Sequence, residues 1–523
     1  MAQDHIFNSI KVERPNRNTF DLSHAVNMSF DMGHLVPCCC IDMVPGDKVS
    51  IGAETMLRFS PLIAPIMSKV NVTMWYFAVP DRILFDNPKD WEEWIVGEGQ
   101  DGHINAYISN MQNNQPGTLL DHLYKLQNLP GNEEVLAAPA AAYFKIYDDW
   151  FRNQNITDVE KFVPLNINEN MVAYRALLEA DPLRRTWEKD YFTAALPWAQ
   201  KGDAVTLPLL EDGGNLDVEL SGVNAVGLIR NASDGLGGTP GDSLDIGTGS
   251  GLVAGVGATA SFYDPNGTLS VPLSAAAATV NQLRMAYRLQ EYLELDAMGG
   301  TRYTEKIYAH FGVKSPDSRL QRPELLGRWT GRMSISEVLQ TSAGGVGTPL
   351  GTMGGHGISL IQGDPIQYYA TEHCWLIGII NVQPKPQYSQ GIQRKFLRFD
   401  HLDYFWPKFA HVGEQEIKNR ELYAFSAAPD DVFGYTPRYA EYRYEAGTIT
   451  GQMRTTLAHW HTGRIFDNEP ALNEDFVNCN PTNRIFNIDY DQGGEYNDDQ
   501  IFGLVHHNIY MSRLMPKYGR PTL

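Results

Sequence analysis

The sequence predicts a mainly β protein, and three observations support this. Tyr and Phe, which favour strands, total 47 residues, while 30 Pro and 47 Gly indicate many loops and turns. Segments with strand patterns gather in two blocks, near the two ends of the chain. A long insertion and several helical segments separate these blocks, which is typical of a β-sandwich with elaborated loops.

The first block contains two clear strands. Residues 47–59 follow a Pro-Gly-Asp turn signal at Pro45 to Asp47. Residues 69–79 carry large or β-branched side chains on both alternating faces. A strand that is apolar on both faces is expected to be covered on both sides, so this strand is predicted to lie inside the molecule.

Two helices are predicted between the blocks. Residues 133–152 place aromatic side chains at helical spacing, with the firm part of the helix after Pro139. Those aromatic residues are interpreted as packing residues. Residues 280–298 show a second helical pattern, and Gly299 and Gly300 provide its stop signal.

The composition changes abruptly over residues 202–279. This stretch is rich in Gly, Ala, Ser, Thr and Asp, and its only base is Arg230. Because so few large apolar residues cannot build a good core, the stretch is predicted to be an insertion that does not fold alone. The expected domain is therefore formed by residues 1–201 and 280–523 together.

Strand patterns return after the insertion, at residues 373–382, 448–456 and 501–511. No internal repeat of fixed period is evident. The length of 523 residues suits one large domain with long insertions as well as several ordinary domains.

Charge and composition exclude several classes of protein. The net charge of −20 comes from 62 acids against 42 bases, so a freestanding nucleic-acid binder is not expected. No apolar run reaches the length of a membrane helix, and residues 1–8 resemble no secretory signal, so neither membrane insertion nor export is expected. The five cysteines lack CxxC spacing and are interpreted as buried free thiols in a reducing compartment.

No motif indicates catalysis, a cofactor or a metal. The Gly-rich runs at 235–238 and 247–251 do not have the spacing of a phosphate-binding loop. His459, His461, His506, His507 and the acidic run 489–499 contain polar groups, but neither HExxH nor a calcium-loop pattern. We expect no catalytic residues, no cofactor-binding residues and no metal site.

Basic residues near the two ends provide the one candidate site. The last 21 residues contain Arg513, Lys517 and Arg520 and no acid. Lys11, Arg14 and Arg17 lie near the start, although acids accompany them. These six residues are candidates for contact with nucleic acid or with a basic partner, and Tyr510 and Tyr518 are candidates for base stacking. A solvated terminus is the alternative.

Long stretches of the chain resemble the VP1/F-type major capsid proteins of the gokushovirus-like microviruses, which are small single-stranded DNA bacteriophages. The two most specific stretches are residues 299–305 (GGTRYTE) and 315–324 (SPDSRLQRPE). Other matching stretches are residues 19–24 (TFDLSH), 29–33 (SFDMG), 44–47 (VPGD), 58–61 (RFSP), 70–72 (VNV), 76–80 (YFAVP), 404–407 (YFWP), 413–416 (GEQE) and 438–442 (RYAEY). The resemblance covers most of the chain except residues 202–279.

The resemblance implies a single eight-stranded antiparallel jelly roll with inserted loops and helices. It also implies a T=1 icosahedral shell of about 60 copies around a circular single-stranded DNA genome. Residues 202–279 would form a protrusion at the three-fold axes that attaches to a host surface receptor. A small basic DNA-binding protein and a minor pilot-type protein would be further partners, and particles would assemble in the bacterial cytoplasm.

Two alternatives from other classes remain open at this point. A cytoplasmic all-β carbohydrate-active enzyme would use the many aromatic and carboxylate side chains to line a cleft. An attachment protein that decorates a virion would bind a receptor without closing a shell. Particle formation by the purified chain distinguishes the capsid reading from both.

Overall fold

A computed structural model describes residues 16–96, 104–109, 115–126, 134–157, 159–203, 205, 228–231, 260–263, 280–314, 316–339, 351, 353–487 and 499–518. These residues form mostly antiparallel β-structure with shorter helices. The chain divides into two compact units, Met1–Lys201 with Glu294–Leu523, and Gly202–Leu293.

The larger sheet of the first unit is built around two long strands that pair along most of their length, β4 and β17. The edge of β17 that does not face β4 pairs with β2 along its first part and with β1 along its last part. The edge of β4 that does not face β17 pairs with β13 along its first part and with β12 along its last part. The strands are β1 (Asn18–Asp21), β2 (His24–Phe30), β17 (Ile501–Arg513), β4 (Lys48–Phe59), β12 (Met353–Gln362), β13 (Ile366–Tyr369) and β11 (Ser334–Leu339). All of these pairings are antiparallel.

The smaller sheet has four antiparallel strands. Its spatial order is β10 (Glu324–Arg332), β5 (Val70–Pro80), β14 (Cys374–Pro384) and β3 (Val36–Met43). β5 pairs with β14 along its whole length, so these two buried strands form the centre of this sheet.

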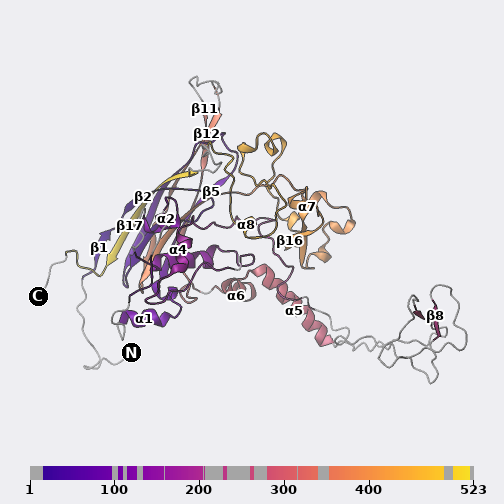
Figure 1. Ribbon diagram of the computed structural model, residues 1–523, viewed down its shortest axis with the longest axis horizontal. Helices are drawn as coiled ribbons and strands as arrows, with labels where there is room; N and C mark the ends of the chain where they lie inside the picture. The colour runs from indigo at the N-terminus through magenta and orange to yellow at the C-terminus, as the bar shows by residue number, and fades with distance from the viewer. Residues whose placement is uncertain are drawn as a thin grey trace. The chain divides into compact units, whose positions relative to one another are not determined.

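The main core lies between the two sheets (Figure 1). Alternate residues of β5, including Val72, Met74 and Tyr76, pack there with residues of β17 such as Val505 and Ile509. The other face of β5 presents Trp75, Phe77 and Val79 to a second core. The prediction that residues 69–79 are covered on both faces is therefore confirmed.

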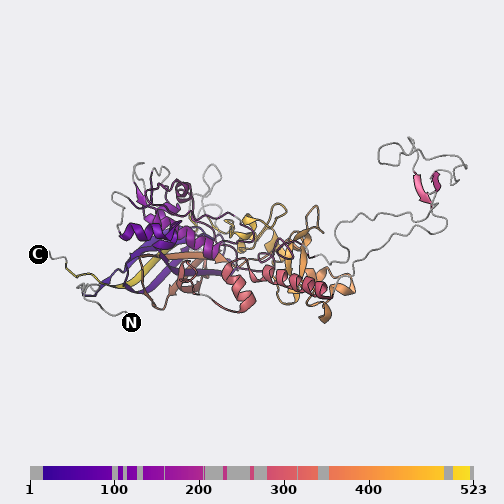
Figure 2. The same ribbon diagram turned by 90° about the horizontal axis from the view of Figure 1, so that it is seen from below.

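Helices form this second core with the smaller sheet, on the side away from the larger sheet (Figure 2). The helices that contribute are α1 (Pro88–Val96), α2 (Leu119–Tyr124), α3 (Ala138–Ile146) and α4 (Val172–Leu178). α3 is almost entirely buried, and its Phe144 stacks on Tyr174 of α4 with ring centroids 5.1 Å apart. The aromatic residues predicted at helical spacing in this region therefore pack in the core, as expected.

A third, smaller core supports the long connection between β14 and β17. It joins Phe192 and Tyr388 to the hairpin of β15 (Glu414–Lys418) and β16 (Val432–Pro437) and to the short helices α7 (Asn419–Leu422) and α8 (Glu474–Val477). The remaining short elements of the first unit are the pair β6 (Tyr107–Ile108) and β7 (Val135–Leu136), and helix α6 (Tyr303–Phe311). The first unit also contains the end of α5 (Val280–Gly299).

The second unit contains the first part of α5 and an antiparallel pair, β8 (Leu228–Asn231) with β9 (Ala260–Tyr263). Most of the predicted insertion 202–279 lies outside the described residues. Among the described helices, none is long and apolar enough to cross a membrane.

The strands predicted at 47–59, 69–79, 373–382 and 501–511 are confirmed to within two residues at each end, and α5 confirms the helix at 280–298. The strand predicted at 448–456 is wrong. Thr448 makes only an isolated bridge with Tyr388. Residues Gly451–Arg454 form a 3₁₀ turn, and the Arg454 side chain donates from Nε to the Ile449 carbonyl at 2.7 Å. β-Branched side chains alone do not make a strand where no neighbouring strand pairs with them.

All five cysteines are free, and four of them are buried, as predicted. Burial raises the pKa of Cys38, Cys40 and Cys479 to about 12. These thiols are therefore unreactive core residues near neutral pH.

Candidate functional site

The six candidate basic residues divide into three groups. Arg17 and Arg513 lie together beside the turn between β3 and β4, because Asn18 of β1 pairs with Arg513 of β17. Lys517 is exposed a few residues further on. Lys11, Arg14 and Arg520 lie outside the described residues.

Arg513 is engaged in a structural ion pair. Its Nε donates to the Asp47 carboxylate at 3.0 Å, and its Nη2 donates to the Asp42 carbonyl at 2.6 Å. The Asp47 side chain is fully buried and that of Arg513 is only 16% exposed. The main role of this guanidinium is therefore to neutralise a buried carboxylate.

Arg17 joins the same turn to the end of β17. Its Nη1 donates to the Gly46 carbonyl at 2.6 Å and to the Ser512 carbonyl at 2.9 Å. Asn18 adds a bond from Nδ2 to the Met515 carbonyl at 2.7 Å. The first and last described segments are therefore tied together by hydrogen bonds to backbone carbonyls. Lys517, Tyr510 and Tyr518 are exposed, and Tyr518 is more exposed than Tyr510.

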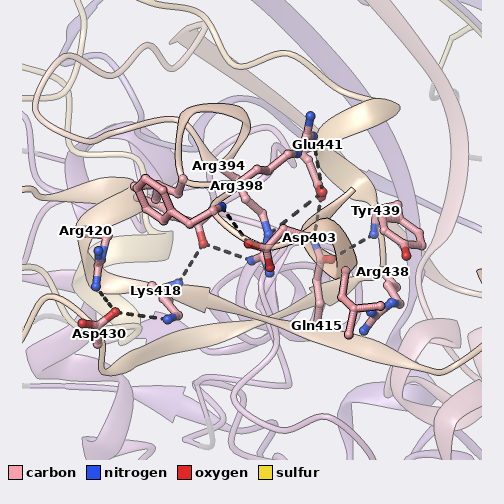
Figure 3. A pocket seen from close by; sticks show the side chains of 14 residues that line it. Arg394, Arg398, Asp403, Gln415, Lys418, Arg420, Asp430, Arg438, Tyr439 and Glu441 are labelled. Atoms are coloured by element: carbon pink, nitrogen blue, oxygen red, sulfur yellow. Dashed lines mark hydrogen bonds and ion pairs between the residues drawn. The ribbon is translucent and has the colours of Figure 1, made fainter. Parts of the chain in front are cut away.

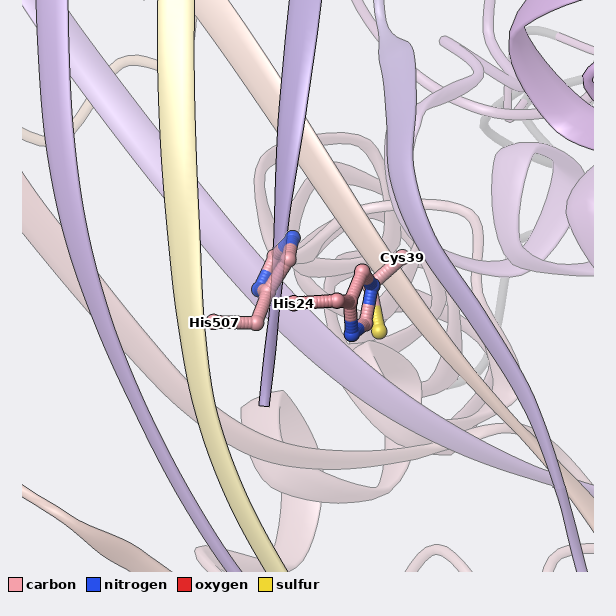
Figure 4. A group of neighbouring side chains, drawn as sticks. All are labelled: His24, Cys39 and His507. Atoms are coloured by element: carbon pink, nitrogen blue, oxygen red, sulfur yellow. The ribbon is translucent and has the colours of Figure 1, made fainter. Parts of the chain in front are cut away.

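A second group that invites a functional reading is His24, Cys39 and His507 (Figure 4). Their possible ligand atoms lie within 4.8 Å of one another, at the core between the two sheets. His24 and His507 face each other across the β2–β17 pair, with ring centroids 4.9 Å apart. Two imidazoles and one thiol are a donor set that suits Zn²⁺.

Hydrogen bonding argues against a metal at this position. His507 Nε2 donates to the Cys38 carbonyl at 3.1 Å, which leaves Nδ1 to accept from the Tyr76 hydroxyl at 2.7 Å. His24 donates from Nδ1 to the Leu22 carbonyl at 2.9 Å. A metal ion would have to break one bond of His507, so these side chains are better described as neighbouring core residues whose imidazoles bond to surrounding groups. Burial, followed by the nearby His24, lowers the pKa of His507 to about 4.

Of the histidines considered from the sequence, His507 belongs to this group, and the others lie elsewhere. His461 donates from Nε2 to the Met453 carbonyl at 2.8 Å and accepts at Nδ1 from the Gly463 amide at 3.0 Å. The acidic run 489–499 lies outside the described residues except for Asp499. Sequence spacing did not identify the His24–Cys39–His507 group, because His507 lies on β17, far along the chain from the strands of His24 and Cys39.

A third feature is a polar pocket of about 290 Å³ in the connection between β14 and β17 (Figure 3). Basic residues of its lining are Arg394, Arg398, Lys418, Arg420 and Arg438, and acidic ones are Asp403, Glu421, Asp430 and Glu441. Most of these charges are paired within the pocket, so it does not resemble a catalytic centre with a free acid and base.

The pairing in the pocket is uneven. Arg394 contacts Glu421 at 3.1 Å, and Arg398 contacts Glu441 at 3.7 Å. Lys418 and Arg420 share Asp430. The Nε atoms of Arg398 and Arg438 are buried, and neither has a hydrogen-bond partner among the described residues.

Comparison with known proteins gives the family. A family model described as capsid protein (F protein) matches residues 8–523. Capsid protein VP1 of Bdellovibrio phage phiMH2K is 33% identical to this chain over 91% of the chain and 90% of the relative. Capsid protein VP1 of Chlamydia phage 1 is 30% identical over 99% and 97%, and that of Spiroplasma virus 4 is 29% identical over 100% and 98%. The chain therefore belongs to the capsid protein (F protein) family of bacteriophages, as a structural protein of the microvirus type and not an enzyme.

Proposed function

We propose that this chain assembles into a T=1 icosahedral shell of about 60 copies. The match of the capsid family model to residues 8–523 carries the proposal, because it spans nearly the whole chain. Exposed aromatic residues on the described surface add support, since assembly interfaces are rich in such side chains.

Electron microscopy and mass measurement of the purified recombinant chain test this proposal. We expect uniform closed particles whose mass corresponds to about 60 subunits. A stable small oligomer under all assembly conditions would reject the shell and would favour the reading as an attachment protein.

We also propose that the two sheets form a single eight-stranded jelly roll. The strand orders support it: β2, β17, β4 and β12 with β13 on one side, and β3, β14, β5 and β10 on the other. From β2 to β5 successive strands alternate between the sheets, and β14 lies between β13 and β17 in the same way. The exceptions are β5 with β10 in the smaller sheet, and β1 with β2 and β11 to β13 in the larger one. Long crossings between two antiparallel sheets are typical of the Greek-key connections in this fold.

The proposed cargo is a circular single-stranded DNA genome. Sixty copies with a net charge of −20 carry a total of about −1200, so the shell cannot neutralise DNA by itself. We therefore include a small basic DNA-binding protein among the partners, together with a minor pilot-type protein. Lys517, with Lys11, Arg14 and Arg520, is proposed as the local contact, while Arg17 and Arg513 fix the chain ends beside it.

Residues 202–279 are proposed as a surface protrusion at the three-fold axes that attaches to a host receptor. Their polar, Gly-rich composition and their place in a separate compact unit support this role. Replacing 202–279 by a short linker is expected to leave shells intact and to abolish host attachment. Loss of shells would show a structural role instead, and unchanged attachment would reject the receptor role.

The proposed location is the virion, with assembly in the bacterial cytoplasm. The five free cysteines support a reducing compartment, because disulfides form and persist mainly in oxidising ones.

A further inference from the structure

The connection between β14 and β17 exposes an unusual number of aromatic side chains. Phe399 is 84% exposed and Phe396 is 67% exposed. Tyr404, Phe405, Trp406 and Tyr442 are each about half exposed. We call these six residues the aromatic surface. Large exposed apolar groups that lie together typically mark an interaction site.

Three members of the aromatic surface, Tyr404, Phe405 and Tyr442, are linked by ring contacts or through Arg398. Phe405 lies 6.0 Å from Tyr442 between ring centroids, and Arg398 lies over Tyr442 at 4.1 Å and over Tyr404 at 5.7 Å. Phe399 lines the polar pocket of Figure 3, while Phe396 lines a neighbouring pocket that shares Arg394, Glu421 and Glu441 with it. Phe396 and Phe399 therefore lie at two pockets that share a set of charged residues.

The backbone beneath the aromatic surface is held in place. The Asp403 carboxylate accepts from the amides of Phe399 and Asp400, each at 2.9 Å. Trp406 donates from Nε1 to the His401 carbonyl at 2.8 Å, and the Phe405 amide donates to the Tyr442 hydroxyl at 3.1 Å. A preorganised surface loses little backbone freedom when it binds a partner.

The charge of this region differs from that of the whole chain. Residues 385–446 contain 9 Lys and Arg against 9 Asp and Glu, so the excess of 20 acids lies in the rest of the chain. A neutral surface on an acidic protein is the face that another copy can approach with the least repulsion. The polar pocket is lined by five bases against four acids, which adds a preference for an acidic group on the partner.

We infer that the aromatic surface is a contact face for a second copy of this chain. Phe396 and Phe399 would bury apolar area against the copy, and a carboxylate of the copy would enter the pocket beside Arg398 and Arg438. Such a contact joins two different faces of the chain, which is the heterologous type that closed shells require. The inference rests on the proposed shell and names one of its interfaces.

The test compares assembly of two matched double variants. Phe396→Ser with Phe399→Ser removes the two most exposed aromatic rings of this face. Leu360→Ser with Phe502→Ser removes two exposed apolar residues from the outer face of the larger sheet, where Leu360 is 73% exposed and Phe502 is 47% exposed. Light scattering measures the protein concentration at which particles appear, and thermal unfolding of the dissociated chains checks that each variant folds.

We expect the Phe396/Phe399 variant to raise that concentration by about tenfold or more, because aromatic residues dominate interface energies. The Leu360/Phe502 variant should assemble like the original chain. Equal assembly of all three proteins, or equal loss in both variants, overturns the assignment of this face. If the unaltered chain forms no particles, the shell proposal itself has failed, so the two failures are distinguishable.

Photo-crosslinking detects the contact in assembled particles directly, without weakening the interface by substitution. A photoreactive phenylalanine analogue at position 399 is expected to yield covalent dimers in assembled particles, and one at position 360 is not. The Arg438→Glu variant should reduce crosslinking from position 399, since it places an acid where a carboxylate is expected to bind. Absence of dimers from position 399 in intact particles contradicts the inference.

Discussion

The role expected of Arg513 from the sequence differs from the role that its contacts in the structure indicate. In the sequence it is a base in a stretch without acids, which favours contact with phosphate. In the structure it pairs with Asp47, 466 positions away, whose side chain is fully buried. No spacing rule connects two residues so far apart, so this role could not be predicted from the sequence.

Replacing Arg513 by Ala is therefore expected to destabilise the fold. Removing one partner of a buried ion pair leaves an uncompensated charge, with a typical cost of about 3–5 kcal/mol. Urea unfolding of the dissociated chain measures this cost. Lys517→Ala is the matched control and should unfold like the original chain, because Lys517 is exposed. Adding Asp47→Asn to Arg513→Ala should recover part of the loss, and no recovery would contradict the ion-pair account.

His507 makes a second prediction at the residue scale. Its pKa in the folded chain is about 4, and the ordinary value is 6.5, so the unfolded chain binds the proton more readily between these values. The contribution of neutral His507 to the free energy of unfolding is therefore fully present above pH 6.5, and it is lost as the pH falls from 6.5 to about 4. At 1.36 kcal/mol per pKa unit, the loss is about 3 kcal/mol.

The measurement is urea unfolding at several pH values for the original chain and for His507→Gln. Gln can still donate to the Cys38 carbonyl and accept from Tyr76, but it does not titrate. The difference in unfolding free energy between the two proteins is expected to change by about 3 kcal/mol between pH 7 and pH 4. A constant difference over this range would show that His507 does not contribute to acid sensitivity. His34, whose burial lowers its pKa to about 3, is present in both proteins and cancels in the comparison.

At the scale of elements, the sequence predicted those strands and helices whose pattern is local. β5 shows large side chains on both faces, and both faces are buried. Residues 448–456 show that β-branched side chains are insufficient, since that segment turns where no strand pairs with it. Strand pairing is a long-range property: β17 forms contacts with β1, β2 and β4 from the other end of the chain, which periodicity does not specify.

The helical layer on the smaller sheet gives a prediction about elements. Phe144 of α3 is fully buried and stacks on Tyr174 of α4. Phe144→Ala is expected to cost about 3–5 kcal/mol, because it removes a core ring and leaves a cavity between helix and sheet. Val172→Ala on α4 serves as the exposed control and should cost little. Denaturant unfolding measures the free energy of unfolding of both variants. Equal values for the two would mean that the helical layer does not contribute to the cooperative fold.

At the scale of the whole molecule, the acidic net charge opposes the proposed DNA cargo, so the location of the exposed bases matters. Exposed bases have to act locally, because the protein as a whole repels phosphate. The structure buries most of Arg513 against Asp47, whereas Arg17 stays exposed although its Nη1 donates to the β3–β4 turn. It leaves Lys517 and the neighbouring Tyr518 exposed at the end of the described chain.

The last prediction follows from this division. Lys517→Ala with Tyr518→Ser is expected to leave shell assembly and stability unchanged, because neither side chain is buried. It should reduce the DNA content of particles or lower the salt concentration at which DNA is released, since it removes the proposed phosphate contact and stacking ring from every subunit. Lys385→Ala is the control for loss of one exposed base elsewhere. The ratio of absorbance at 260 and 280 nm, followed during a salt titration, measures both effects. Full particles with the DNA content and salt tolerance of the original chain would show that this end of the protein is only a solvated terminus, and DNA contact would then have to be sought among bases on other faces of the subunit.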